Sequence, residues 1–309
     1  MGKKISVIGA GNVGASLAQR LAEKGYADVV LLDIIQGLPQ GKALDILQSS
    51  LVTGCDAAIT GTNDYKDTTG SEVVVITSGT TRKPGMTRNE LLKTNAGIIT
   101  EVIQNIVRYS PDCTIVMVTN PADAITYLAL KVSGFSPSRV VGLSGVLDSA
   151  RLSSFIAAEL KVSVSEVSSI VLGEHGQNMV VIPRLATVKG TPITELLPRE
   201  TVERLVERTV NGGAEIVSLL KTGSAFYAPA ASATRMVEAI IMDKSEILPC
   251  AAYLQGEYDI KDVVIGVPVR LGKTGIEEIV EIELTPEEKS ALKSSAEAVR
   301  ELIKTMESG

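Results

Sequence analysis

The first half of the chain alternates short apolar segments with segments that carry helix signals. The apolar segments are rich in Val and Ile and mostly apolar throughout, which is typical of strands covered on both faces in a parallel sheet. We expect strands at Lys4–Ile8, Val29–Leu32, Ala57–Thr60, Glu72–Thr77, Thr114–Thr119 and Val140–Leu143. The alternation predicts an N-terminal α/β domain built on a doubly wound parallel sheet.

Helix signals lie between these strands. Residues 12–24 repeat apolar positions at helical spacing and stop before Gly25, a residue suited to the left-handed conformation that ends helices. Thr87-x-x-Glu90 is a capping box that opens a long helix. In Asn120-Pro121-Ala122-Asp123 we expect Asn120 to be the N-cap of another helix, followed by Pro at its first position and an acid in its first turn.

The second half has longer extended segments, and Gly and Pro interrupt the later ones. We expect strands around Val167–Leu172, Met179–Val188, Leu248–Leu254, Val263–Val269 and Glu277–Leu284. We expect helices over Glu200–Leu219 and Ser224–Ile241, and a last one that starts at Thr285-Pro286-Glu287-Glu288. This texture predicts a C-terminal α+β domain with antiparallel hairpins. The division falls near Leu143–Gly145, which gives domains of residues 1–143 and 144–309.

Composition excludes several classes of partner. The net charge is −6 over 309 residues, and no run of Lys and Arg occurs, so we expect neither a nucleic acid nor a membrane as partner. The three cysteines are scattered and form no CxxC pair, which favours free thiols in a reducing compartment and therefore a cytoplasmic protein. No apolar run approaches the roughly 20 residues needed to span a bilayer.

A glycine-rich turn follows the first expected strand and opens the first expected helix. The sequence is Gly9-Ala10-Gly11-Asn12-Val13-Gly14. Such a turn brings backbone N–H groups and the positive helix end to a pyrophosphate. Asp33 follows 19 residues after Gly14, at the end of the second strand, where a carboxylate accepts hydrogen bonds from a ribose and repels a 2′-phosphate. The pattern predicts a Rossmann-type site for NAD, preferred over NADP; the alternative is a structural turn with a surface carboxylate.

The chain contains a single histidine, His175, between glycines in Gly173-Glu174-His175-Gly176. Its position just after an expected strand makes it the natural candidate for a group that takes and returns a proton near neutral pH. A His-rich metal site is excluded, and we expect no metal. Asp148 is our candidate for the carboxylate that orients the imidazole. The alternative is that Asp148 forms only a surface ion pair with Arg151, three residues along the same helix.

Two further arginines, Arg82 and Arg88, lie in a segment marked by Gly and Pro between a strand end and a capped helix. We expect this segment to be a mobile lid. Arginine offers a planar fork that matches a carboxylate. Considered singly, each of these arginines is better explained as a solvated surface charge, and only the pattern that they form with the other motifs favours a binding role.

Assembled in order, these motifs make the chain resemble the lactate/malate dehydrogenase family, in particular the lactate-dehydrogenase-like malate dehydrogenases. The resemblance runs almost end to end. It is carried by GAGNVG at 9–14, Asp33, RKPGMTR at 82–88, Asn95, TNPAD at 119–123, LDSAR at 147–151 and GEHG at 173–176.

The resemblance implies a function and a set of roles. His175 would accept the proton of a 2-hydroxy acid, oriented by Asp148, and Arg151 would bind the C1 carboxylate of the substrate. Arg88 would polarise the carbonyl when the lid closes, and Asn120 would hydrogen-bond the substrate oxygen. The residues that would contact NAD are Gly9, Ala10, Gly11, Asn12, Val13, Gly14, Asp33, Asn95, Val118, Thr119 and Asn120.

Arg82 occupies the position that reads the far end of the substrate in this family, where Arg goes with malate and Gln with lactate. The physical reason is that a second carboxylate buried under a closed lid needs a cation. We therefore expect a small dicarboxylate substrate, the malate/oxaloacetate pair. The alternatives are a lactate dehydrogenase and, from another class, a non-enzymatic NADH-binding protein on the same fold. Family members are usually homodimers or homotetramers, and Gly41–Leu51 is a candidate helix face for a partner subunit; the alternative is that this face packs on its own domain.

Overall fold

The computed structural model describes residues 2–80 and 88–307, and within them one sheet of eleven strands forms the centre of the molecule. The strand order is β3-β2-β1-β4-β5-β6-β12-β13-β8-β9, with β14 also paired to β13. The bounds of these strands are β1 Lys4–Ile8, β2 Asp28–Leu32, β3 Ile59–Thr62, β4 Val73–Ile76, β5 Thr114–Met117, β6 Val140–Gly142, β8 Val171–Gly173, β9 Met179–Val181, β12 Glu246–Gln255, β13 Lys261–Gly272 and β14 Gly275–Ile279.

The first six strands in this order are parallel, which confirms the expected doubly wound sheet. Ile5 of β1, for example, lies opposite Val29 of β2 on one side and Val73 of β4 on the other. All four residues of β4 are fully buried, as the continuous apolar pattern of this segment predicts for a strand covered on both faces. The expected strand ranges agree with these bounds within two residues.

The second half continues the same sheet with antiparallel strands, as expected for the α+β domain. β12 joins β6 through the pair Ala251 and Gly142, and β12 and β13 form a long hairpin. Two expected strands are divided. Residues 167–172 form β7 (Val167–Ser168) and β8, which lie in different sheets, and residues 179–188 form β9, a 3-10 turn and β10 (Thr187–Val188). The second break falls at Pro183, which has no N–H for a strand ladder.

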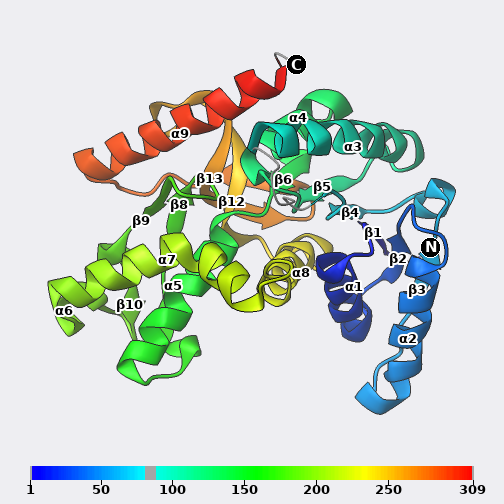
Figure 1. Cartoon of the computed structure of the whole chain (residues 1–309), viewed down its shortest axis with the longest axis horizontal. Helices are drawn as coiled ribbons and strands as arrows, with labels where there is room; N and C mark the ends of the chain where they lie inside the picture. The colour runs from blue at the N-terminus through cyan, green and yellow to red at the C-terminus, as the bar shows by residue number, and fades with distance from the viewer. Residues whose placement is uncertain (1, 81–87, 308–309) are drawn as a thin grey trace.

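Helices cover both faces of the large sheet (Figure 1). On one face α3 (Arg88–Tyr109), α4 (Ala122–Ser133) and α9 (Pro286–Glu307) pack together, and on the other α1 (Asn12–Lys24) packs against α8 (Tyr227–Ile241). The remaining helices are α2 (Leu38–Thr53), α5 (Gly145–Leu160), α6 (Ile193–Leu196) and α7 (Arg199–Leu220). β7, β10 and β11 (Thr191–Pro192) form a small separate sheet. Among the described residues, no helix is both long and apolar enough to cross a membrane.

The start of α4 differs from the expectation. Its N-cap is Pro121, with extended backbone and no side-chain cap, so Asn120 lies one residue outside the predicted position. An N-cap residue has a non-helical backbone, which Pro121 adopts with its ring-fixed φ of −68° and a ψ of 118°. The peptide between Asn120 and Pro121 is cis. Asn120 is therefore not a cap, and its side chain is free of that role.

Candidate active site

The glycine turn between β1 and α1 contains three glycines with different surroundings. A Cβ on Gly14 would lie 1.8 Å from the carbonyl oxygen of Gly9, and Gly9 itself has a φ of +103° and a Cβ position 2.7 Å from the Ser78 nitrogen. These two glycines are required by the close packing of the turn on β4 and α1. A Cβ on Gly11 would meet nothing within 4 Å. The open space beside Gly11 is what a ligand that approaches the backbone needs.

The polar groups around this turn fit a dinucleotide. The N-cap of α1, Gly11, provides no side chain to the first N–H groups of the helix, which leaves them for an anion. Asp33 follows β2, and its carboxylate accepts the N–H of Ala10 at 2.7 Å and that of Ile35 at 3.0 Å. Lys42 of α2 donates to the Ala10 carbonyl oxygen at 2.7 Å. Sequence reasoning missed Lys42, because its position depends on how α2 packs and not on a local motif.

Four of the residues expected to contact NAD lie around the carboxyl ends of β4 and β5. Thr119 donates its hydroxyl to the Ser78 carbonyl oxygen at 2.6 Å. The Asn95 side chain joins both strand ends, since it accepts the N–H of Thr80 at 2.8 Å and donates to the Asn120 carbonyl oxygen at 2.9 Å. Val118, the residue after β5, is half-buried beside them. The structure thus brings the four expected residues of this region to one edge of the sheet.

His175, Asp148 and Arg151 form one hydrogen-bonded group. The Nδ1 atom of His175 lies 2.7 Å from Oδ2 of Asp148, and Nη1 of Arg151 donates to Oδ1 of the same carboxylate at 3.0 Å. The Asp148 side chain is 1% exposed, whereas those of His175 and Arg151 are each 13% exposed. The ion pair between Asp148 and Arg151 is present, but it is not the surface pair of the alternative hypothesis: it is buried, and its carboxylate also binds the imidazole. Asp148 therefore bridges the two groups that sequence reasoning had assigned to proton transfer and substrate binding.

This group is electrostatically set to hold a proton. Burial alone lowers the pKa of an imidazole, but the charge of Asp148 and the hydrogen bond to it outweigh this and raise the pKa of His175 above its ordinary value. Because Nδ1 faces the carboxylate, it carries the proton in the neutral ring, and Nε2 is the atom left to accept one. The Nε atom of Arg151 is buried and has no acceptor within the described part of the chain.

Asp123, in the first turn of α4, fixes the histidine from the other side. Its Oδ2 atom accepts the backbone N–H of His175 at 2.9 Å, while Oδ1 is buried without a hydrogen-bond partner among the described residues. Burial raises the pKa of Asp123 to about 7, against the lowering effect of that hydrogen bond. Sequence reasoning saw this acid only as a first-turn residue. The 52 positions that separate it from His175 leave no local signal for the contact.

The structure leaves two of the expected site residues, Arg82 and Arg88, wholly or partly undescribed. Arg82 lies outside the described residues, and Arg88 is the first residue of α3 but its side chain also lies outside them. Residues 2–80 and 88–307 contain no group of three or more His, Cys, Asp or Glu side chains able to hold a metal ion.

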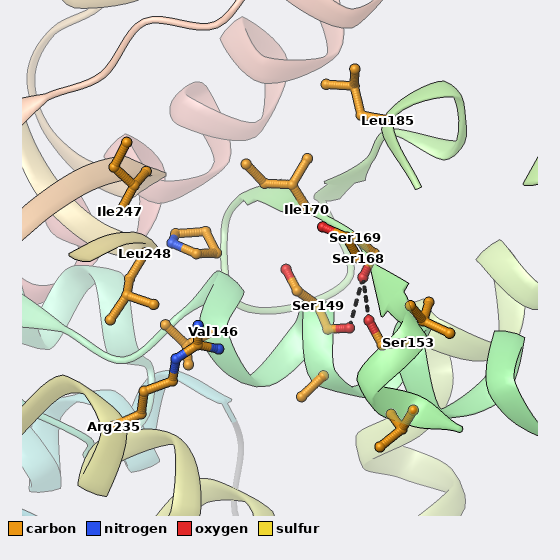
Figure 2. A pocket seen from close by; sticks show the side chains of 14 residues that line it. Val146, Ser149, Ser153, Ser168, Ser169, Ile170, Leu185, Arg235, Ile247 and Leu248 are labelled. Atoms are coloured by element: carbon orange, nitrogen blue, oxygen red, sulfur yellow. Dashed lines mark hydrogen bonds between the residues drawn. The ribbon is translucent and has the colours of Figure 1, made fainter. Parts of the chain in front are cut away.

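A cavity of about 540 Å³ lies against the face of α5 that does not carry Asp148 and Arg151 (Figure 2). It is lined from α5 by Val146, Ser149, Ala150 and Ser153, and the Arg235 side chain of α8 points into it. At 100° per residue, Asp148 and Arg151 project from the opposite face of the helix. This cavity is therefore separate from the hydrogen-bonded group around His175.

Comparison with known proteins covers the whole chain. The sequence profile of the lactate/malate dehydrogenase NAD binding domain matches residues 3–142, and that of the lactate/malate dehydrogenase alpha/beta C-terminal domain matches residues 145–309. A malate dehydrogenase of Dehalococcoides mccartyi is 58% identical over 303 residues, which cover 98% of this chain and 99% of that protein.

Solved structures of related enzymes match the fold of this chain along almost its full length. The crystal structure of Cryptosporidium parvum malate dehydrogenase matches with a TM-score of 0.97 and 42% identity, covering 100% of both chains. The lactate dehydrogenase of the same organism, complexed with lactic acid and the cofactor NAD, matches with a TM-score of 0.96 and 39% identity, covering 100% of this chain and 99% of that one.

A hydride-transfer enzyme needs a dinucleotide site and a proton carrier on one scaffold, and the two halves of this chain match the two domains of such enzymes. The protein is an NAD-dependent 2-hydroxy-acid dehydrogenase, as the sequence predicts. It belongs to the lactate/malate dehydrogenase family.

The buried carboxyl of Asp123 predicts a specific dependence of stability on pH. Its pKa is raised to about 7 from 3.8, so the unfolded chain releases this proton at lower pH than the folded one, and the free energy of unfolding falls as pH rises from about 4 to about 7. At about 1.4 kcal/mol per pKa unit, the shift amounts to on the order of 4 kcal/mol. Asp123→Asn keeps an oxygen acceptor for the His175 N–H and cannot ionise.

We expect Asp123→Asn to exceed the wild type in thermal unfolding by a small margin at pH 5, where the loss has only begun, and by a much larger margin at pH 8.5. Asp45→Asn, at an exposed position of α2, is the control and should change neither value. A variant that loses stability equally at both pH values would show that Asp123 is ionised throughout this range.

Proposed function

We propose that this protein is an NAD-dependent malate dehydrogenase that interconverts (S)-malate and oxaloacetate. The observation that carries the proposal is the Asp148 carboxylate, which holds the imidazole of His175 and the guanidinium of Arg151 on its two oxygens. Relatives 54–58% identical to this chain are malate dehydrogenases, which supports the choice of substrate.

His175 acts as the acid and base. The Nε2 atom accepts the hydroxyl proton when malate is oxidised, and Asp148 stabilises the imidazolium that forms. In the opposite direction the same imidazolium returns the proton to the carbonyl oxygen of oxaloacetate. The raised pKa of His175 favours this protonated form, which is the one that reduction requires.

Arg151 binds the C1 carboxylate of the substrate. One of its donors, Nη1, is committed to Asp148, and its buried Nε atom has no acceptor among the described residues, which supports a guanidinium with N–H groups left for a ligand. A carboxylate matches a guanidinium in a bidentate pair, and the low exposure of Arg151 strengthens that pair. Asn120 and Arg88 are both assigned to the substrate oxygen.

NAD, when bound, would supply the acceptor for the hydride of the carbinol carbon. The first turn of α1 would bind its pyrophosphate beside Gly11, and Asp33 would bind its adenosine ribose. Ala10, Asn12 and Val13 line the same turn. Asn95, Val118 and Thr119 hold the nicotinamide end at the edge of β4 and β5, and Gly9 and Gly14 keep the turn close to the sheet.

Arg82 selects a four-carbon diacid. A second carboxylate enclosed in the site needs a cation, because burying it unpaired costs several kcal/mol. The alternative substrate, lactate, has a methyl group at that end and gives Arg82 no partner.

We also propose a homo-oligomer, a dimer or a tetramer, in which α2 contacts a second subunit. Only Pro39 and Ala43 of this helix are buried, while Leu44, Leu47 and Leu51 are 55%, 46% and 92% exposed. A helix that is apolar on several sides is normally covered. Ala43 and Ile46 pack on the helix's own domain, and Leu44, Leu47 and Leu51 form the uncovered side that supports the proposal. The two domains of residues 1–143 and 144–309 and a cytoplasmic location complete the proposal.

Loss of the imidazole should abolish chemistry without loss of the cofactor. We expect His175→Asn to bind NADH within about twofold of the wild type, by fluorescence titration, and to lose about a hundredfold or more in kcat. Turnover within tenfold of the wild type would remove His175 from its proposed role.

The substrate assignment is tested by oxidation of NADH at 340 nm. The wild type should reduce oxaloacetate much faster than pyruvate, and Arg82→Gln should lower kcat/KM for oxaloacetate by about a hundredfold while leaving that for pyruvate equal or higher. Lys83→Gln, a neighbouring loss of charge, is the control. Faster reduction of pyruvate by the wild type would favour the lactate alternative, and turnover of neither substrate would favour a binding protein.

The assembly proposal predicts that Leu51→Asp reduces the particle to a smaller species in analytical ultracentrifugation. Because Leu51 is 92% exposed, the change should leave the folded subunit intact by circular dichroism. Gln104→Asp, at an exposed position of α3, is the control for an added charge. A monomeric wild type at micromolar concentration contradicts the proposal.

A further inference from the structure

Two adjacent glycines occupy the middle of α7. Gly212 and Gly213 are the fourteenth and fifteenth of the 22 residues of a helix that spans Arg199–Leu220, and both lie away from its ends. Glycine is among the poorest helix formers, because it loses more backbone freedom than any other residue. Two successive glycines in a helix interior therefore lower the stability of the helix, and the packing around them accounts for the absence of side chains.

Gly212 continues the buried stripe of α7. The buried positions of this helix are Val202, Leu205, Thr209 and Gly212, at the spacing of three and four residues that marks one helix face. The first three positions carry side chains that fill the interface. At Gly212 the space is filled from the neighbouring helix.

The filling group is Arg151 of α5, which packs against α7 (Figure 1). A Cβ on Gly212 would lie 3.2 Å from Cδ, 3.7 Å from Nε and 3.9 Å from Cγ of Arg151. A Cβ on Gly213 would lie 3.7 Å and 3.9 Å from its two terminal nitrogens. The side chain of Arg151 therefore lies along the bare backbone of both glycines.

Arg151 has little room to yield. Its Nη1 atom is held at 3.0 Å by Asp148, whose carboxylate is 1% exposed and also bound to His175. A contact of 3.2 Å is tighter than ordinary van der Waals packing, so a methyl group at position 212 shifts the arginine by a few tenths of an ångström. At position 213 the same methyl group makes an ordinary contact.

We propose that Gly212 is a positioning residue for Arg151: the missing side chain sets where the guanidinium stands and thereby how tightly the enzyme binds the C1 carboxylate of its substrate. The inference rests on the proposed role of Arg151. Gly213 keeps the adjoining surface open for the guanidinium nitrogens.

The test compares Gly212→Ala with Gly97→Ala. Gly97 also lies within a helix, α3, but a Cβ there meets nothing within 4 Å, so both variants gain helix propensity and only one meets the arginine. We expect Gly212→Ala to raise KM for oxaloacetate and the inhibition constant of tartronate by about tenfold, with a smaller change in kcat. Gly213→Ala should change both constants by less than Gly212→Ala.

Two further measurements separate positioning from general damage. Gly212→Ala should bind NADH at least as tightly as the wild type, and its thermal midpoint should be no lower than that of the wild type. If Gly212→Ala does not fold, Gly213→Val, with Gly97→Val as its control, should raise the same two constants.

The outcomes distinguish this inference from the proposed function. A wild type that fails to reduce oxaloacetate contradicts both. A wild type that reduces oxaloacetate, with Gly212→Ala within twofold of it in KM and tartronate inhibition, contradicts the positioning role alone. A rise in KM that Gly97→Ala reproduces contradicts it as well.

Discussion

The buried carboxylate of Asp148 is the constraint on which the rest of the site depends. One oxygen binds the imidazole of His175 and the other binds the guanidinium of Arg151, at 2.7 Å and 3.0 Å. Pairing on both oxygens offsets the cost of burying this carboxylate, which is 1% exposed, so each partner stabilises the position of the other. Proton transfer and recognition of the substrate carboxylate are thus coupled through one residue of α5.

The scaffold brings the three groups together across the middle of one sheet. α5 follows β6, the last parallel strand, and the loop with His175 follows β8 in the antiparallel part. α4, which starts at the end of β5, reaches the same loop through Asp123. Because β6 and β12 join the two parts of the sheet, the dinucleotide turn and the histidine belong to one continuous layer.

Local features of the sequence predicted local structure well. The helix over residues 12–24 has the predicted bounds, since apolar spacing and Gly25 both act within a few residues. Gly9, Gly14 and Asp33 also lie as the motif predicts, because a strand, a tight turn and a helix fix them. His175 and Asp148 were correctly paired from chemistry, since a lone imidazole in a hydride-transfer enzyme needs an orienting carboxylate.

Contacts between distant residues were beyond prediction from sequence. Asp123 binds a backbone 52 positions away, and Lys42 reaches the glycine turn only because α2 packs beside it. The contact between Gly212 and Arg151 likewise joins two helices that no local motif connects. The segment 167–172, read as one strand, is divided between two sheets, because the choice of sheet depends on neighbours that the segment itself does not contain.

The most direct test of the account follows the pKa of His175 by NMR. The chain has one histidine, so its ring resonances report on this site alone. The account predicts a pKa above the ordinary 6.5 in the wild type and a clear decrease in Asp148→Asn, where the burial that lowers the pKa is no longer opposed by a negative charge. A wild-type pKa at or below 6.5, or one that Asp148→Asn leaves unchanged, would contradict it.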